Sequence, residues 1–210
     1  MLGHLRPYVG SLKRLIAWPY LKAGLSATQV GIFGVALSVL SVSTLRYGFQ
    51  TTAFWLAVIA VLTDMADGEV ARLRGHVTPL GNYYDAVLDR VREGVLLFGL
   101  IPYSSNLVAL AILGSFLTSF AKARTSLVII TDNRDWKGVG DHADRAVMIL
   151  LCYAFPQYIS TTLSLLVGVT WSCFFSRMRQ AEEMIKKARG EELLPYLRDD
   201  DRPDSDLYHR

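Results

Sequence analysis

The chain has 210 residues, of which 51% are hydrophobic, and its formal net charge is only +3. The apolar residues are gathered into long runs and the mean hydropathy is +0.28, a pattern that excludes an ordinary soluble domain. Cys152 and Cys173 both lie inside apolar runs, so we expect neither a disulfide framework nor a cysteine metal site.

Residues 1–22 alternate apolar and basic side chains and include Trp18 and Tyr20, residue types found at membrane interfaces. This pattern predicts an amphipathic helix that lies on a membrane surface, although a helix packed on the rest of the protein fits it equally well. We expect Pro19 to kink or end this helix. No small-residue cleavage site follows the first long apolar run, so a secretory signal is not expected.

The remaining sequence predicts an all-α integral membrane protein with six transmembrane helices. Ser26 or Thr28 is available as the N-cap of the first of them. After the last span we expect a charged helix to about residue 189, and the Asp-rich stretch 199–206 predicts disorder. The expected organisation is therefore an interfacial helix (1–22), a membrane domain (23–189) and a charged tail (190–210). The predicted spans are about 24–45, 51–74, 82–103, 107–130, 143–153 and 160–175.

Basic residues orient these spans. Lys and Arg crowd into residues 6–22, 72–74, 122–145 and 177–189, whereas the opposite loops contain only Arg46. The positive-inside rule then predicts a multi-pass protein of the inner (cytoplasmic) membrane with both termini in the cytosol.

Four aspartates occur at helical spacing around the turn between the second and third spans. Asp64 and Asp67 share one face of a helix, as do Asp85 and Asp89 on the next. Carboxylates at this density predict one or two hard divalent cations, Mg2+ or Mn2+. Paired ions of this kind are a recurring solution for phosphoryl chemistry.

The depth of these acids follows from the apolar runs beside them. The run 51–63 gives only about 20 Å of helix, less than the hydrocarbon thickness of about 30 Å. The acids must therefore lie within the membrane, open toward the cytosolic side. Intramembrane acids mark function by default. The competing interpretation is a salt-bridged hairpin in which Asp64 and Asp67 pair with Arg72, Arg74 or Arg90.

The pattern Asp64-x2-Asp67-Gly68-x2-Ala71-Arg72-x8-Gly81-x3-Asp85-x3-Asp89 resembles the signature of the CDP-alcohol phosphotransferase family at every position. The resemblance implies a CDP-linked lipid as substrate, whose lipid-side phosphate is attacked by an alcohol while CMP leaves. It also implies that Asp64, Asp67, Asp85 and Asp89 hold metal and that Asp89 accepts the proton of the attacking hydroxyl. A homodimer is expected from the family, and no nucleic-acid partner is expected.

The nucleotide would lie against the same two helices. Gly68 and Gly81 have no side chain and would allow its close approach, although helix packing or a turn also accounts for them. Ala71 is required only to be small, and Arg72 is suited to pair with phosphate. Asp64 completes the expected nucleotide-binding set.

A phosphorylated acceptor would need basic groups, and several helices bring them to the predicted cytosolic face. The candidates are Lys122, Arg124, Arg145 and Arg177, with Arg179 beside them. The alternative is that they only contact lipid headgroups. The Lys122-Ala-Arg124 segment resembles the archaeal and actinobacterial branches that use inositol phosphate, which favours inositol 1-phosphate over glycerol 3-phosphate. The stretch 141–145 has His142 where those branches tend to have arginine.

Two other functions compete with a transferase. A cation transporter would use intramembrane carboxylates, but it would need them along a path across the bilayer. A scaffold that keeps an old motif is disfavoured because no signature position is lost. Outside the motif, we expect His76 to be a solvated turn residue and Glu69 and Glu93 to be surface or ion-pair residues.

Overall fold

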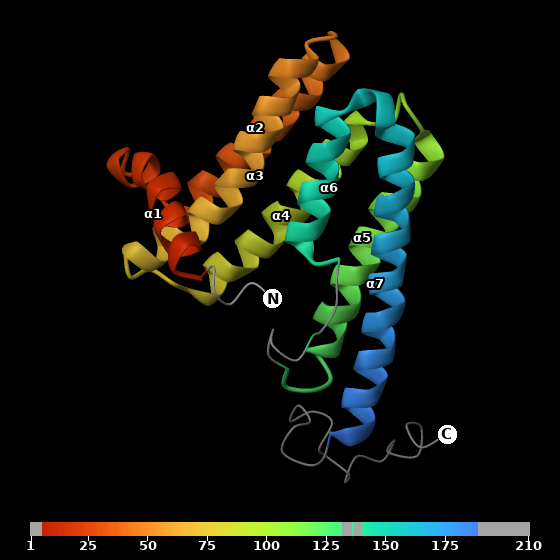
Figure 1. Cartoon of the computed structure of the whole chain (residues 1–210). Helices are drawn as coiled ribbons and strands as arrows, with labels where there is room; N and C mark the ends of the chain where they lie inside the picture. The colour runs from red at the N-terminus through yellow and green to blue at the C-terminus, as the bar shows by residue number, and fades with distance from the viewer. Residues whose placement is uncertain (1–5, 132–135, 137–139, 189–210) are drawn as a thin grey trace.

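A computed structural model describes residues 6–131, 136 and 140–188, and its regular elements are helices. Figure 1 shows them in chain order. Their bounds are α1 Arg6–Lys22, α2 Ala27–Arg46, α3 Gln50–Leu73, α4 Pro79–Gly99, α5 Ser105–Thr125, α6 His142–Ala154, the 3-10 turn η3 Pro156–Tyr158, and α7 Ile159–Lys187.

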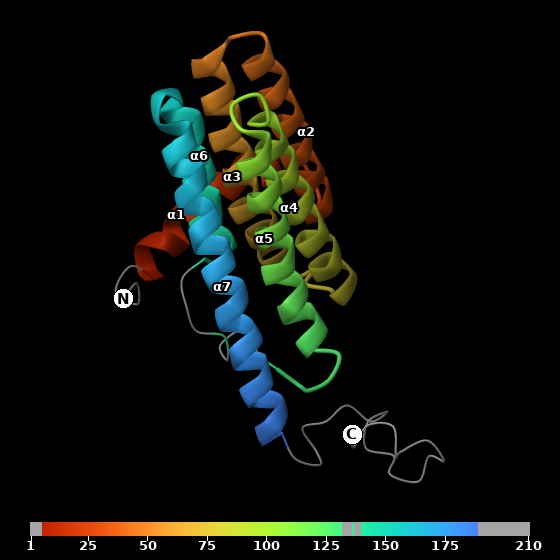
Figure 2. The same ribbon diagram turned by 90° about the vertical axis from the view of Figure 1, so that its right-hand side faces the viewer.

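The helices after α1 run up and down as neighbours. α2 and α3 form one hairpin, α5 and α7 lie side by side, and α4 and α6 lie between these pairs (Figures 1 and 2). The turns at 47–49, 100–104 and 155–158 gather at one end of the bundle. The α3–α4 turn, the start of α6 and both ends of the described chain lie at the other end (Figure 1). The end with the three turns is the turn end of the bundle, and the end with the α3–α4 turn is the motif end.

An apolar core fills the turn end. Leu96 and Leu97 of α4, and Leu100 directly after it, are buried there against residues of α6 and α7. The Tyr153 hydroxyl donates a 2.8 Å hydrogen bond to the Leu96 carbonyl, so the phenol is satisfied inside the core. Gly99 has no room for a side chain, because a Cβ atom there would lie 2.6 Å from the Tyr153 hydroxyl. Close approach at small residues is how helices pack in lipid.

The observed helices follow the predicted ones in order, with three differences. α5 ends at Thr125, before the predicted end near residue 130. α7 runs unbroken to Lys187, so the last predicted span and the charged segment after it are one helix. α1 continues through Pro19 to Lys22, so Pro19 does not end the helix, and the kink that was the other expectation stays a prediction. The expected disorder at 199–206 and the tail 190–210 lie outside the described residues.

Local capping explains where α2 begins. Ser26 is its N-cap: the Ser26 hydroxyl accepts from the Gln29 backbone N–H, and the Gln29 side chain accepts from the Ser26 backbone N–H at 2.8 Å. This reciprocal capping box satisfies two donors that a helix start otherwise leaves open. Of the two predicted candidates, Ser26 is therefore the cap.

Three of the described helical segments are long and apolar enough to cross a membrane: Ala27–Arg46, Ser105–Thr125 and Pro156–Lys187. The two helices that carry the aspartates, α3 and α4, are not among these segments. The integral membrane character predicted from composition is consistent with these segments, while the count of six spans remains a prediction.

Helix α1 has two different faces. Ala17 is buried in a small cluster with Val30, Ala66 and Val70 of α2 and α3. On the other face, Leu15 is 70% exposed and Trp18 55% exposed. One face therefore packs on the protein, as the alternative interpretation required, and the other leaves an apolar surface uncovered by the described residues.

Candidate active site

The four motif aspartates converge where α3 and α4 approach the motif end. One carboxylate oxygen from each of Asp64, Asp67 and Asp85 lies within 4.8 Å of the other two. Asp64 also forms such a group with Asp89 and His142. The packing of α3 on α4 therefore brings together all four acids that the sequence singled out.

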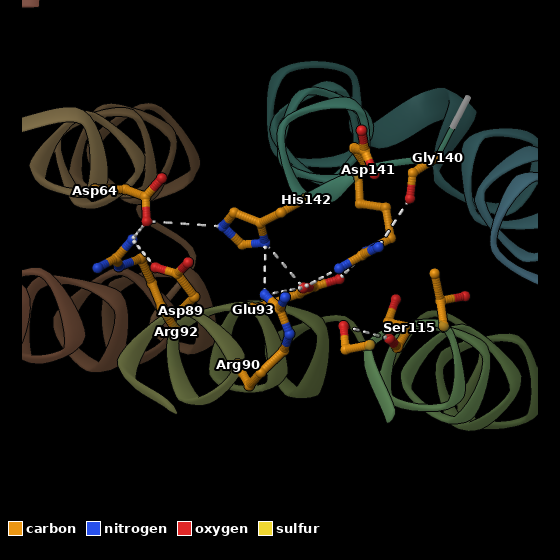
Figure 3. A network of polar contacts seen from close by, with 12 residues as sticks. Asp64, Asp89, Arg90, Arg92, Glu93, Ser115, Gly140, Asp141 and His142 are labelled. Atoms are coloured by element: carbon orange, nitrogen blue, oxygen red, sulfur yellow. Dashed lines mark hydrogen bonds and ion pairs between the residues drawn. The ribbon is translucent and has the colours of Figure 1, made fainter. Parts of the chain in front are cut away.

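An arginine that the sequence analysis missed lies among these acids. Arg92 Nη1 is 2.7 Å from Asp64 Oδ1 and 3.4 Å from Asp89 Oδ1, as Figure 3 shows. Its Nη2 is 3.9 Å from Asp67 Oδ2. The side chain is 2% exposed, and its Nε and Nη2 have no hydrogen-bond partner among the described residues. Arg92 follows Asp89 by three residues on α4, so its helical spacing was the available signal.

The ion pairs of the structure differ from those of the salt-bridged hairpin. That alternative required Arg72, Arg74 or Arg90 as partners of Asp64 and Asp67. Arg72 instead contacts Glu69 at 3.0 Å, and Arg90 lies beside His142 and Glu93. The salt-bridge partner of Asp64 and Asp67 is Arg92, an arginine that the alternative did not include.

One guanidinium does not balance four neighbouring carboxylates. Anions this close in a partly buried site repel one another strongly unless further positive charge is present. Their oxygens are the donors that hard divalent cations prefer, and the separations within each group allow shared ligation of an ion. The residues present therefore fit a divalent metal site.

A cavity of about 650 Å³ opens beside these acids, between the start of α2, the end of α3 and the start of α4. Four of the five predicted nucleotide-binding residues line it, namely Gly68, Ala71, Arg72 and Gly81, together with Asp67 and Asp85. Asp64, the fifth, lies one helical turn before Gly68. The segment 26–28 and His76, which is exposed as predicted, also line the cavity.

The two glycines of the motif have different surroundings. A Cβ atom on Gly68 would meet only Arg72 Nη2, at 3.9 Å, so internal packing does not require a glycine there. Gly81 lies in the first turn of α4, where its N–H donates to the Thr78 hydroxyl at 3.0 Å. The open space over Gly68 is therefore available to a ligand, whereas Gly81 also serves the helix start.

Glu69 holds the Arg72 side chain over this cavity. Its carboxylate accepts from Arg72 Nε at 3.1 Å and from Nη2 at 3.0 Å, while Arg72 remains 57% exposed. Arg14 of α1 is 3.7 Å from the same carboxylate. Glu69 is thus an ion-pair residue, as expected, and it leaves much of the Arg72 guanidinium accessible.

A second cluster of charges lies behind the aspartates (Figure 3). The Glu93 carboxylate accepts from Arg145 Nε at 2.6 Å and from Nη2 at 3.0 Å, and Arg145 Nη1 donates to the Gly140 carbonyl at 2.8 Å. Arg145 is only 1% exposed. Glu93 is therefore one of the ion-pair residues that the sequence predicted, but it is buried rather than on the surface.

The four predicted acceptor-binding residues are not gathered at one place. Arg177 donates to the Asp141 carboxylate and to the Thr118 carbonyl. Arg124 is exposed and lines a separate apolar groove between α5 and α7, together with Arg179. Lys122 is half-buried on α5. Among the contacts that the described residues show, Arg145 binds Glu93 beside the acids and Arg177 binds Asp141 at the start of α6.

The chain resembles known proteins over most of its length. Residues 25–177 match the model of a family described as CDP-alcohol phosphatidyltransferase. Archaetidylinositol phosphate synthase of Pyrococcus horikoshii is 22% identical over 89% of this chain and 99% of its own length. Phosphatidylinositol phosphate synthase of Mycobacteroides abscessus is 37% identical over 52% of this chain and 54% of its own length.

The fold has solved counterparts. The crystal structure of Mycobacterium tuberculosis phosphatidylinositol phosphate synthase with CDP-DAG bound has a TM-score of 0.69 at 23% identity, covering 81% of this chain and 94% of that one. The same protein in complex with manganese and citrate has a TM-score of 0.65, covering 81% and 88%. At this identity the likeness establishes the fold.

Proposed function

The chain belongs to the CDP-alcohol phosphatidyltransferase family, and on that premise we propose that it is a membrane enzyme of phospholipid synthesis. It moves the phosphatidyl-type group of a CDP-linked lipid to the hydroxyl of an acceptor alcohol and releases CMP. Family membership favours this reaction over a cation transporter or a scaffold.

The observation that carries the proposal is the junction between the acids and the cavity. Asp67 and Asp85 belong to the carboxylate cluster and also line the 650 Å³ space beside Gly68 and Arg72. A pyrophosphate lying in that space would have the acids at one side and an accessible guanidinium at the other. The open backbone at Gly68 suits close approach of the nucleotide.

We assign roles to the residues from these positions. Asp64, Asp67, Asp85 and Asp89 would hold Mg2+ or Mn2+, two ions in all, and the bound ions would supply positive charge to the phosphates. Arg72 pairs with a phosphate, and Ala71 leaves room beside it. Asp89 is the proposed acceptor of the hydroxyl proton. Its contact with Arg92 holds the carboxylate toward Asp64 and His142.

The acceptor that we propose is inositol 1-phosphate, with glycerol 3-phosphate as the alternative. The names of the two relatives above, both inositol phosphate lipid synthases, support the first. Lys122, Arg124, Arg145 and Arg177 are the proposed phosphate-binding residues. Because Arg145 already donates to Glu93, an acceptor phosphate has to share that guanidinium with the carboxylate.

We also propose a membrane arrangement with six spans, α2 to α7, in the inner membrane. Both ends of the described chain and the carboxylate cluster lie at the motif end, where Lys and Arg are concentrated, which supports a cytosolic site. α1 would lie at the interface with Leu15 and Trp18 toward lipid. The domain limits 1–22, 23–189 and 190–210 and a homodimer complete the proposal.

The decisive experiment measures CMP release by the purified full chain with CDP-lipid and Mg2+ or Mn2+. We expect release with inositol 1-phosphate and little without any acceptor. Glycerol 3-phosphate, inositol and serine are the comparison acceptors. CMP release with none of these would refute the proposed function, and release only with glycerol 3-phosphate would replace the proposed acceptor.

A further inference from the structure

His142 begins α6 and reaches toward the carboxylate cluster from outside the motif. Its Nε2 is 3.9 Å from Asp64 Oδ1, and it forms a group with Asp64 and Asp89 in which one potential ligand atom from each lies within 4.8 Å of the others. Figure 3 shows the imidazole between Asp64 and Glu93. Neither the motif nor the nucleotide cavity includes this residue.

The separation suits two ligands of one ion. At metal–ligand distances of about 2.1 Å, neighbouring ligands in an octahedral shell are about 3.0 Å apart and opposite ones about 4.2 Å apart. The 3.9 Å between His142 Nε2 and Asp64 Oδ1 falls within this interval. A direct hydrogen bond between these two atoms would be shorter.

The other ring nitrogen is held by a buried carboxylate. His142 Nδ1 is 3.1 Å from Glu93 Oε2, and Glu93 is fixed by its two bonds to Arg145. Histidines that bind metals usually donate their second ring N–H to such a carboxylate, which leaves the first nitrogen with a free lone pair. With Nδ1–H toward Glu93, the Nε2 lone pair faces Asp64.

Arg90 offers the opposite arrangement. Its Nη1 is 3.2 Å from His142 Nδ1 and 3.9 Å from Glu93 Oε2. If Nδ1 accepted from Arg90, Nε2 would carry the proton and could not bind an ion. The two contacts of Nδ1 are nearly equal in length, so the choice depends on the partners. Arg90 retains Glu93 as an ion-pair partner without the imidazole, so the tautomer with Nδ1–H toward the carboxylate leaves no charged group unpaired.

We propose that His142 Nε2 is a ligand of the divalent ion held at Asp64 and Asp89, in addition to the carboxylates of the motif. The proposal rests on the proposed function, since it adds a ligand to the metal site invoked there. A nitrogen donor makes this position better suited to Mn2+ than to Mg2+, which prefers oxygen ligands. His142 would therefore favour binding of Mn2+ over Mg2+ at this position.

The test is electron spin echo envelope modulation of Mn2+ added alone to the purified full chain, without CDP-lipid or acceptor. We expect the modulation of a directly bound imidazole nitrogen in the wild type and its loss in His142→Gln. His76→Gln is the matched control, because His76 lines the neighbouring cavity, and it should keep the signal. Mn2+ affinity should fall about tenfold in His142→Gln, and Mg2+ affinity by less.

The outcomes separate the two proposals. Mn2+ bound without nitrogen modulation in the wild type, or a signal lost in His76→Gln instead, overturns the role of His142 and leaves the proposed function standing. Failure of the wild type to bind any Mn2+ at the carboxylates would count against both. If His142→Gln does not fold, the wild type labelled with 15N-histidine must still show the nitrogen isotope in the signal.

Discussion

The structure holds a buried and a partly buried cluster of charge only one turn of α4 apart, and the two differ in whether their charges are balanced. In the cluster around Glu93, a carboxylate and the guanidinium of Arg145 satisfy each other through two short hydrogen bonds. In the cluster around Asp64, which has four carboxylates, one arginine, Arg92, contacts those of Asp64, Asp67 and Asp89. The first cluster needs nothing further, whereas the second has more negative charge than its own residues balance.

This difference indicates what each cluster does. A buried ion pair whose partners are matched fixes the relative position of two helices, here α4 and α6, and removing one partner is costly. Buried like charges destabilise a fold and persist where a ligand uses them. We therefore expect substitutions in the Glu93 cluster to act mainly on stability, and substitutions in the aspartate cluster to act mainly on turnover.

The largest effect is expected for Asp85→Asn. Loss of one carboxylate from the cluster should lower CMP release by about a thousandfold, the scale for a group that acts on transition-state charge. Thermal stability without metal should hold or rise, because repulsion among the acids is reduced. The control is Glu182→Gln, an exposed carboxylate of α7 paired with Lys186 at 2.5 Å, which should keep full activity. An active Asp85→Asn enzyme would contradict the metal assignment.

Next in size is Arg145→Met, which keeps most of the side-chain volume and removes the charge. Because Glu93 would be left buried without its partner, we expect a loss of about 3–5 kcal/mol in unfolding free energy. The control is Arg124→Met at an exposed position of α5, for which stability should not change.

Acceptor KM then separates the two possible roles of Arg145. A rise in acceptor KM in folded Arg145→Met supports its share in phosphate binding. An unchanged KM with reduced stability would leave it a purely structural residue and remove it from the acceptor site.

A smaller effect is expected for Arg92→Leu. This substitution tests directly whether the aspartate cluster lacks positive charge. Removing a positive charge that lies 2.7–3.9 Å from three of the carboxylates should raise Mn2+ affinity about tenfold or more, because the ion no longer competes with a guanidinium. Arg92→Lys keeps the charge and should change affinity much less. Titration calorimetry with Mn2+ measures both. Weaker Mn2+ binding in Arg92→Leu would mean that Arg92 orients the aspartates rather than competing with the ion.

The same two clusters show which contacts could be predicted from the sequence and which could not. Spacing within a helix fixes which residues share a face, so the convergence of Asp64 with Asp67, and of Asp85 with Asp89, was predictable. Contacts between helices depend on register, which spacing does not give. Arg92 therefore escaped notice as the partner of Asp64, 28 positions away, as did Arg145 as the partner of Glu93, 52 positions away.

Burial was the other quantity that the sequence left open. Arg145 and Arg177 look like solvent-facing basic residues at helix ends, because nothing local distinguishes them from Arg124. Their partners, Glu93 and Asp141, come from other parts of the chain. A guanidinium is stable in a buried position only when such a partner is present. The start of α2 was predicted better, since its cap is local and the Ser26 hydroxyl was one of the two candidates.

The smallest expected effect concerns a glycine beside the aspartate cluster, and a second glycine in the apolar core provides the comparison. Gly68→Ala places a methyl group into the cavity, where its nearest neighbour is Arg72 Nη2 at 3.9 Å, so stability should be unchanged or slightly higher. If the nucleotide approaches the backbone there, KM for the CDP-lipid should rise several-fold. Gly99→Ala instead crowds the Tyr153 hydroxyl and should lower stability by about 1–3 kcal/mol. Thermal unfolding and KM for the CDP-lipid, measured on both variants, test these expectations. An unchanged KM in Gly68→Ala would mean that the nucleotide does not approach this face of α3.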